Sequence, residues 1–454
     1  MKNTKLSLLS RLTPVQLLLL FYSVAVILSS LLLALPVSQK EGVDLEYIDI
    51  LFTAVSAISV TGLSTISIIE SLSTFGLFVL LLMMQLGAVG IMAMGTLIWM
   101  ILGKKIGLRE RQLIMADQNH NHFSGGVRFI KEIVYLLFFI ELLGFILLGT
   151  YFLNYFPSVN EAYFQGLFAT ISAISNGGFA ITGNSFIPFQ DDYFVQIIIM
   201  LLIILGAIGF PVWREIKAYC CFKLKQQQSY RFHFSLFTKV TVITFFLLIV
   251  AGSIGIYLFD MNHFFAGQSW HEAFFYSLFQ SVTTRSAELN TMEISHLTEE
   301  NLLFIAALMF IGASPNSAGG GIRTTTFALV VIFVITFARG GKSLRIFNRE
   351  VYDEDLMKAV TVSLVAFIIL FAATLIISVI EPYSVLAIVF EVMSAFGTVG
   401  LSLGITENLS GFSKLVLMVL MFIGRVGVIT FLLTFNRRKK KANIHYPKER
   451  MIIG

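Results

Sequence analysis

This sequence of 454 residues predicts an all-α membrane protein that crosses the bilayer several times. Hydrophobic residues make up 56% of the chain and charged residues 13%, whereas soluble domains are about 45–50% apolar and about 25% charged. The apolar runs reach about 20 residues or more, the length that a helix needs to cross a hydrocarbon core of about 30 Å. A β-barrel would show short alternating segments instead. Similar segments also recur along the chain, which indicates an internal repeat.

The first apolar run, residues 15–35, is too long for the core of a signal peptide and lacks a small-residue cleavage site, so we expect a retained span. The two cysteines, Cys220 and Cys221, are adjacent in a basic segment. They therefore provide neither a disulfide framework nor a thiolate metal site.

The net charge of +5 is distributed as in a membrane topology and does not indicate nucleic-acid binding. Lysine and arginine gather at the N-terminus, in segments 104–131, 214–231 and 339–349, and in the tail at 437–441. The positive-inside rule places all of these in the cytoplasm. We therefore expect both termini inside, an even number of crossings, contact with the lipid bilayer and no nucleic-acid partner.

The first repeat unit consists of a span, a half-length helix, a loop and a return span. Residues 50–59 form a short apolar segment that leads into the loop 60–64, Val-Thr-Gly-Leu-Ser, and residues 75–102 form the return. The short segment is about half as long as a crossing, so we expect it to enter the membrane and turn back. Such backbone is tolerated only beside protein or a water-filled cavity.

The same unit recurs three times. Its span, half-helix, loop and return are predicted at 133–156, 164–175, 176–179 and 193–213; at 237–259, 273–284, 285–289 and 302–337; and at 360–380, 386–397, 398–402 and 415–435. The repeats therefore occupy 1–115, 116–232, 233–350 and 351–436, followed by a basic cytosolic tail at 437–454.

The alignment of the four units is set by positions 62, 178, 288 and 400, which are 116, 110 and 112 residues apart. Three of the units share a serine six residues before this position and a phenylalanine ten before it, namely Ser56, Ser172 and Ser394 with Phe52, Phe168 and Phe390. Because each unit begins and ends inside, all four have one orientation. We expect four parallel M1-P-M2 repeats, with eight transmembrane helices and four re-entrant pore helices around one pseudo-fourfold pore.

The loop at 398–402 suggests the chemistry of this pore. Thr-Val-Gly can extend so that successive carbonyl oxygens replace the water around a cation, and glycine supplies conformations closed to other residues. Close packing of apolar helices would also use small residues, and this stays the alternative. The matching copies favour an ion filter.

These features resemble the Trk/Ktr/HKT superfamily of potassium transporters, and within it the Ktr-type membrane subunit. The matching motifs are Leu-Gly-Lys-Lys-Ile-Gly-Leu at 102–108, Ser-Val-Thr-Thr-Arg at 281–285, Thr-Val-Gly-Leu-Ser at 398–402 and Phe-Ile-Gly-Arg at 422–425. The similarity runs from about Thr13 to the Tyr446-Pro447 tail. It implies potassium uptake across a bacterial plasma membrane by a homodimer with one pore per subunit, docked on a cytosolic ring of RCK-type nucleotide-binding regulatory subunits.

The resemblance also implies a set of filter residues. By position these are Val60, Thr61 and Gly62; Asn176, Gly177 and Gly178; Ser286, Ala287 and Glu288; and Thr398, Val399 and Gly400. Potassium is then expected to bind at these residues only, as the transported ion. Sodium is a candidate coupled or activating ion, and no cofactor is expected in this chain.

Glu288 departs from the family pattern, which has glycine at this position. One interpretation directs its carboxylate to the outer vestibule as a cation attractor, and we favour it because a charge buried in a membrane is costly. The other holds that Glu288 distorts the filter, since a residue other than glycine resists a positive φ. The alternative function is then a transporter less selective between potassium and sodium.

Residues 312–321 interrupt the return span of the third unit with a proline and three successive glycines, which do not continue a helix. Backbone of this kind at membrane depth implies a cavity beside it. The resemblance implies an intramembrane gating loop with Arg425 as a cationic latch. The expected gating residues are Gly312, Pro315, Gly319, Gly320, Gly321, Arg323 and Arg425. A kink without a gating role, and an arginine paired for structure alone, stay as alternatives.

Two further expectations concern charged residues in the spans. Arg285 adjoins the third loop and is expected to form a structural ion pair that holds it, because an intramembrane cation needs a partner. A membrane enzyme would need paired ionisable residues on neighbouring helices, and the spans hold few of them. We therefore expect a non-enzyme, with a scaffold that does not transport as the other alternative.

Overall fold

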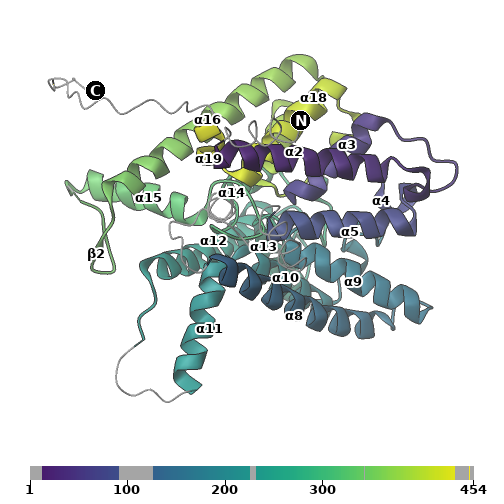
Figure 1. The fold of residues 1–454 in the computed structure, drawn as a ribbon, viewed down its shortest axis with the longest axis horizontal. Coiled ribbons are helices and arrows are strands. Elements are labelled where there is room, and N and C mark those ends of the chain that lie inside the picture. The colour runs from purple at the N-terminus through teal and green to yellow at the C-terminus, as the bar shows by residue number, and fades with distance from the viewer. Residues whose placement is uncertain (1–12, 91–125, 225–231, 342, 435–448, 450–454) are drawn as a thin grey trace, which may run out of the picture.

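The computed structural model describes residues 13–90, 126–224, 232–341, 343–434 and 449, and it is mostly helical (Figure 1). Within these residues the strands are β1 (Arg345–Ile346) and β2 (Arg349–Glu350), which pair antiparallel. The basic N-terminus, most of the predicted basic segment 104–131, the motif at 102–108 and almost all of the tail 437–454 lie outside the described residues.

Helices occur in the same order in each of the four units. The first holds α2 (Pro14–Leu33), the short turn η1 (Pro36–Ser38), α3 (Tyr47–Ser59), α4 (Ile68–Ser71) and α5 (Thr74–Val89). The second holds α8 (Gly126–Phe152), α9 (Val159–Ser175), η2 (Ile187–Phe189), α10 (Tyr193–Ala207) and α11 (Phe210–Leu224). The third holds α12 (Leu236–Asp260), α13 (Trp270–Thr283), η3 (Ile294–His296), α14 (Glu299–Phe310) and α15 (Thr324–Ala338). The fourth holds α16 (Asp353–Ile380), α17 (Val385–Gly397), η4 (Thr406–Asn408), α18 (Gly411–Val426) and α19 (Val428–Thr434).

The first long helix of each unit, α2, α8, α12 or α16, is long and apolar enough to cross a membrane. Only 22–33% of the residues in their apolar windows are buried inside the protein, as expected for surfaces that face lipid. Among the described residues these are the four helices that qualify, or five if α10 and α11 are counted together. The chain is therefore a multi-pass membrane protein, while the predicted total of eight crossings stays a prediction.

The short apolar segments before the loops are α3, α9, α13 and α17, and their C-terminal ends lie within one residue of the predicted positions. They begin three to five residues earlier for α3, α9 and α13, and one residue earlier for α17. Serine caps explain the difference for α9, α13 and α17, because each serine oxygen accepts a backbone N–H of the first turn. The remaining helix, α3, begins after Glu46 without a side-chain cap. Ser158 accepts from Glu161 at 3.1 Å and Ser269 from Glu272 at 3.4 Å. The first turns are polar, so a prediction from runs of apolar residues places the helix starts too late.

The return spans predicted at 193–213 and 415–435 are each interrupted once in the structure. The helices break at glycines with a positive φ, which lies outside the helical region. These are Gly90 after α5 (φ 93°), Gly209 between α10 and α11 (φ 99°) and Gly427 between α18 and α19 (φ 93°). The axes of α10 and α11 differ by 100°, and α11 projects away from the other helices in Figure 1. The third return is broken at 311–323, where the interruption was predicted.

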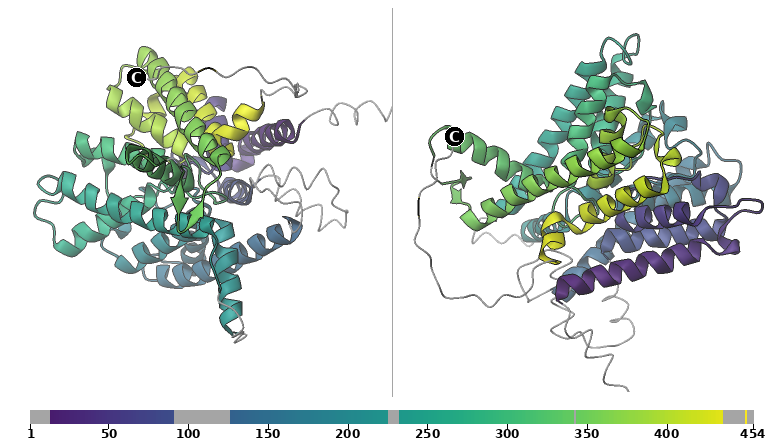
Figure 2. Two further views of the ribbon diagram at one scale, coloured as in Figure 1. Left: turned by 90° about the vertical axis from the view of Figure 1, so that its left-hand side faces the viewer. Right: turned by 90° about the horizontal axis from the view of Figure 1, so that it is seen from above.

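The helices pack as a closed ring. Each helix that follows a loop packs on the short helix of the next unit, so that α5 contacts α9, α10 contacts α13, α14 contacts α17 and α18 contacts α3. The last of these contacts joins the two ends of the chain, and Figure 2 shows α18 near the purple N-terminal helices. A buried ion pair between Lys414 on α18 and Asp49 on α3, 2.7 Å long, lies in the same interface. The ring brings the C-terminal ends of the four short helices together.

Candidate functional site

The four loops share a positive φ at two positions. Val60, Asn176 and Thr398 end their helices with left-handed φ values of 56°, 56° and 49°, and Ser286 has a φ of 94°. Two residues later φ is again positive, at 94° for Gly62, 77° for Gly178, 55° for Glu288 and 89° for Gly400. The alignment predicted from the sequence therefore matches the backbone, including at the position where glycine is replaced.

Backbone hydrogen bonds close the helix ends in the same way in three loops. The N–H groups of Thr61, Gly177 and Val399 donate to the carbonyls of Ser56, Ser172 and Ser394 at 2.9, 2.8 and 2.9 Å. In the third loop Ala287 donates to Thr283 at 3.0 Å, one residue closer. All four helices direct their C-terminal ends toward the loops, and the partial negative charge at a helix C-terminus favours a cation. In the third loop this hydrogen bond therefore closes a turn that is one residue shorter than in the other three loops.

The third and fourth loops are joined by side-chain hydrogen bonds. Ser286 Oγ lies 2.9 Å from Thr398 Oγ1 and also donates to the carbonyl of Thr398. The backbone N–H of Gly320 donates to the same Ser286 oxygen at 3.4 Å. Ser286 and Thr398 are fully buried. The first filter position of these loops is therefore in direct contact with the segment that interrupts the third unit.

Glu288 lies in the ring formed by the three glycines of the other loops. A Cβ added to Gly62, Gly178 or Gly400 would in each case overlap atoms of the Glu288 side chain. Its Oε2 is shielded from solvent and has no hydrogen-bond partner among the described residues. Glu288 therefore lies between the loops that the sequence analysis predicted as the filter, and both interpretations of its role stay predictions. The glycines leave the space that its carboxylate fills.

The segment 311–323 lies against the third and fourth loops and is held by the broken helices around it. Ser314 and Ala318 donate backbone N–H groups to the carbonyls of Ala207 and Gly206 at the end of α10, at 3.0 and 3.1 Å. Gly321 donates to Gly424 on α18 at 3.2 Å. A Cβ at Gly320 would lie 2.5 Å from Thr398 Oγ1. Because glycine occupies this position, the loop can approach the filter closely.

Two arginines bind the carbonyls of this segment. Arg425 donates from Nη1 to Ala318 and Gly319, and from Nη2 to Gly87 and Ala88 at the end of α5. Arg323 donates to Gly319 and, at 3.5 Å, to the carbonyl of Arg425. The two guanidinium groups thus donate hydrogen bonds to backbone carbonyls of three segments, which are the interrupting loop, the end of α5 and the end of α18. Arg425 contacts the loop as the sequence analysis expected, and its role as a latch stays a prediction.

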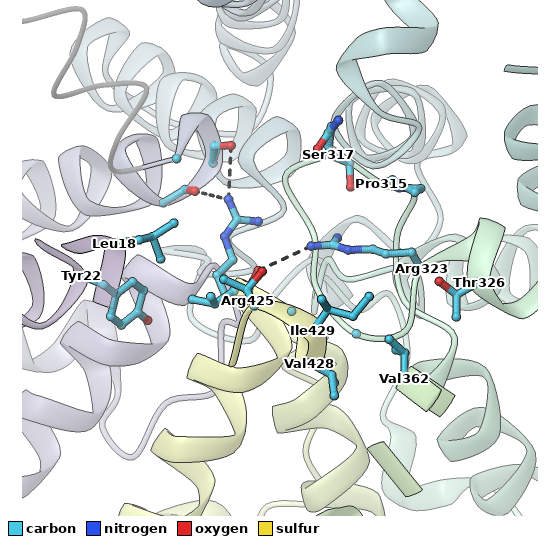
Figure 3. A pocket seen from close by; sticks show the side chains of 18 of the residues that line it. Leu18, Tyr22, Pro315, Ser317, Arg323, Thr326, Val362, Arg425, Val428 and Ile429 are labelled. Carbon is cyan, nitrogen blue, oxygen red and sulfur yellow. Dashed lines mark hydrogen bonds between the residues drawn. The ribbon is translucent and has the colours of Figure 1, made fainter. Parts of the chain in front are cut away.

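A cavity of about 150 Å³ borders both arginines (Figure 3). It is lined by residues of α2, α3, α5, α11, α15, α16, α18 and α19 and by the interrupting loop, and these include Tyr22, Pro315, Gly321, Thr326 and Val428. Pro315 and Gly321 both belong to the predicted gating set, and backbone of this kind was expected to lie beside a cavity. The interrupted segment therefore lies between the third and fourth loops and this cavity.

Arg285 differs from its expectation. It is fully buried, and its Nη1 donates to the carbonyl of Ile311 at 2.7 Å. Among the described residues it forms no ion pair, and its Nε and Nη2 have no partner. The predicted structural ion pair is thus replaced by a hydrogen bond to the backbone at the end of α14. The residue still links the third loop to the start of the interrupted segment.

The sequence analysis missed three glycines of the return helices. A Cβ at Gly87, Gly206 or Gly424 would overlap the carbonyl of Ile58, Ile174 or Phe396, respectively. Each of these carbonyls belongs to the helix end just before a filter loop. Small residues at corresponding places of the return spans were the signal, since they allow two backbones to approach closely.

Comparison with known proteins agrees with the fold. The family model described as TrkH, cation transport protein, matches residues 16–446. The Ktr system potassium uptake protein D of Bacillus subtilis is 54% identical over 447 residues, which are 98% of each chain, and the Ktr system potassium uptake protein B of the same organism is 34% identical over 98% of this chain and 97% of its own.

The solved structure of the potassium transporter TrkH from Vibrio parahaemolyticus has a TM-score of 0.73 at 16% identity and covers 93% of this chain and 84% of its own. At that identity the likeness supports the fold alone, and the match of the family model over nearly the whole sequence carries the assignment. The chain belongs to the TrkH family of cation transport proteins, as a Ktr-type membrane subunit.

Proposed function

We propose that this chain takes up potassium across the plasma membrane through a filter of backbone carbonyls contributed by its four loops. The observation that carries the proposal is the shared backbone at positions 60, 176, 286 and 398 and again two residues later. A filter needs carbonyl oxygens in place of water around the ion, with binding weak enough for release. The C-terminal ends of the four short helices add partial negative charge from all sides.

The proposal places the pore on the axis of four M1-P-M2 units, with both termini in the cytoplasm. The ring of contacts from α5 to α9, α10 to α13, α14 to α17 and α18 to α3 supports it. Protein surrounds each loop in this arrangement, which is the condition for irregular backbone at membrane depth. The low burial of the four long helices agrees with a surrounding bilayer.

Residues 312–321 form the gate in this proposal. The segment lies against Ser286 and Thr398 on one side and borders the cavity on the other. Arg425 and Arg323 hold it closed by binding its carbonyls, and their positive charge repels a cation below the filter. Opening requires that these hydrogen bonds break or move. In this proposal cytosolic regulatory subunits of the RCK type control this step, and the chain works as a homodimer. The Ktr system names of its relatives support a membrane subunit that works with other components.

A transporter that also passes sodium is the second candidate. The position of Glu288 among Gly62, Gly178 and Gly400 favours it, because a carboxylate adds a fixed charge to an otherwise neutral ring. Selectivity between two monovalent cations depends on the number and strength of the coordinating dipoles. A fixed charge in the ring changes the binding energy of both potassium and sodium, and so changes the selectivity between them.

Growth of a bacterium that lacks potassium uptake tests the main proposal. Expression of the full chain with its regulatory subunit is expected to restore growth at low potassium. Gly178→Val is the matched negative control, because a branched side chain at φ 77° would overlap Glu288. Rescue by the variant as strong as by the wild type, or no rescue by a wild-type protein present in the membrane, would contradict the proposal.

A further inference from the structure

Glu391 on α17 is a buried carboxylate next to the segment that follows the fourth loop. It is 1% exposed, and its two oxygens accept three hydrogen bonds from that segment. Oε1 accepts from Ser402 Oγ at 2.7 Å and from the backbone N–H of Leu403 at 3.0 Å, and Oε2 accepts from Thr406 Oγ1 at 2.7 Å. Burial of a carboxylate is costly unless hydrogen bonds compensate it. The three donors therefore tie residues 402–406 to α17.

The other three units have no carboxylate at this position of the sequence. Nine residues before positions 62, 178 and 288, the equivalents of Glu391 are Thr53, Ala169 and Phe279. Thr53 Oγ1 donates to the carbonyl of Asp49 within its own helix α3, and alanine and phenylalanine have no polar side-chain atom. The attachment through a carboxylate is therefore specific to the fourth loop.

A weaker tie of the same kind occurs in the second unit. Gln165 on α9 donates from Nε2 to the carbonyl of Ile181, three residues after Gly178, at 3.2 Å. A hydrogen bond that involves an ionised group is about twice as strong as a neutral one. The three hydrogen bonds to a carboxylate therefore hold the chain after the fourth loop more firmly than this amide holds the chain after the second.

The fourth loop is attached to α17 at both of its ends. At its start the backbone N–H of Val399 donates to the carbonyl of Ser394 at 2.9 Å. At its end the chain donates to Glu391, as described above. Gly400 lies between these two attachments, so the positions of the carbonyls on either side of it depend on both. Selectivity of a carbonyl filter depends on how the carbonyl dipoles are arranged around the ion.

We propose that Glu391 is a positioning residue that fixes the fourth loop and thereby sets the selectivity of the chain for potassium over sodium. The inference rests on the proposed function, because it requires the fourth loop to coordinate the ion. Both oxygens of Glu391 accept from residues 402–406, so the carboxylate acts through the backbone and not as an ion ligand. Without this attachment the carbonyls of the loop move inward and adapt to the smaller sodium ion.

The test compares the uptake of potassium and of sodium into liposomes that contain the full chain or one of its variants. Glu391→Ala removes all three hydrogen bonds, and we expect the ratio of potassium to sodium uptake to fall severalfold. Glu391→Gln is expected to keep most of the ratio, because its amide oxygen still accepts from Ser402 and Leu403 and its NH2 group donates to the Thr406 hydroxyl. Ser402→Ala removes one donor and is expected to lower the ratio less, and it tests the inference even where Glu391→Ala does not fold.

Glu381→Ala is the matched control for a purely structural role. Glu381 is also a buried carboxylate of the fourth unit, at 8% exposure. It accepts three hydrogen bonds at the start of α18, from Ser410 N at 2.9 Å, Ser410 Oγ at 2.6 Å and Ser413 Oγ at 2.6 Å. Its removal is expected to lower the melting temperature, as Glu391→Ala does, without changing the uptake ratio. A structural role of Glu391 alone would leave the ratio unchanged in both variants.

Hydrogen–deuterium exchange of the purified proteins, measured by mass spectrometry, provides a second readout that needs no flux. The backbone amides of residues 399–406 are expected to exchange faster in Glu391→Ala than in the wild type, and at the wild-type rate in Glu381→Ala. An unchanged uptake ratio in Glu391→Ala and Ser402→Ala, an equal fall in Glu381→Ala, or unchanged exchange in Glu391→Ala would overturn the inference. Absence of potassium uptake by every protein, wild type included, would instead reject the proposed potassium transport, and faster exchange in Glu391→Ala would then keep the positioning role.

Discussion

The carboxylate of Glu288 packs directly on Gly62 from the first unit, across the ring formed by the four loops. Positions 62 and 288 are equivalent by the repeat, so the contact joins two copies of one position. One copy is a glycine and the other carries a charged side chain. This asymmetry gives the ring a carboxylate on one side and three glycines on the others.

Removing the carboxylate is expected to change selectivity. Glu288→Gly would restore a neutral ring with glycine at all four positions, and a positive φ of 55° suits glycine without strain. We expect the variant to transport potassium with a higher ratio of potassium to sodium flux. The measurement is the uptake of both ions by reconstituted protein. A ratio that does not move would count against a role of Glu288 in the filter.

The contact between Gly62 and Glu288 predicts an energetic coupling. Gly62→Ala adds a methyl group that meets Glu288, at a φ of 94° that alanine also resists. The backbone strain is present in both backgrounds and cancels in a double-mutant cycle with Glu288→Gly. The steric overlap that remains is expected to lower the free energy of unfolding by roughly 1–3 kcal/mol when Glu288 is present. Glu288→Gly is expected to remove this loss.

Thermal unfolding of the four purified proteins in detergent measures this coupling. Gly404→Ala provides the control for strain alone, because Gly404 has a φ of 83° and no atom within 4 Å of an added Cβ. Its effect should be the same with and without Glu288. Additive effects of Gly62→Ala and Glu288→Gly would show that the two residues do not meet.

Arg425 is expected to restrain ion flux. Its guanidinium joins the interrupted segment to the end of α5 through carbonyls of Ala318 and Gly87. Arg425→Ala removes these hydrogen bonds and the positive charge below the filter, so we expect a severalfold rise in potassium flux at equal protein amount. Arg339→Ala, at the exposed end of α15, is the matched control. Flux equal to or below the wild type would reject the latch.

The glycines of the return helices are expected to limit how close the helices lie to the filter. In Gly424→Ala the new Cβ overlaps the backbone carbonyl of Phe396, which cannot move away as a flexible side chain would. We expect a destabilisation of about 1–3 kcal/mol, typical of overpacking. Gly411→Ala lies on the same helix with open space around it and should not destabilise the protein. Equal melting temperatures for both variants would contradict this packing.

The sequence predicted much of this architecture because its signals were local. The C-terminal ends of the short helices and the equivalence of positions 62, 178, 288 and 400 depend on glycine and on the end of an apolar run, which are visible in one dimension. The starts of the same helices were missed, since Ser158 and Ser269 cap polar turns that hydropathy excludes.

Other features depend on contacts between distant units and could not be predicted. The breaks at Gly209 and Gly427 arise from a positive φ inside apolar runs that look continuous. The partner of Arg285, a carbonyl on α14, has no charge to mark it in the sequence. The position of Glu288 depends on three glycines from other units, and the sequence alone does not show that these residues meet.

Cation flux through the purified chain in liposomes tests the central proposal most directly. Uptake of potassium should exceed that of empty liposomes and fall when Thr398→Pro breaks the fourth loop, because proline cannot adopt the φ of 49° found there. We predict that the wild type takes up potassium and that the loop variant does not. No uptake by a folded wild type, or equal uptake by the loop variant, would contradict the assignment of these loops as the filter.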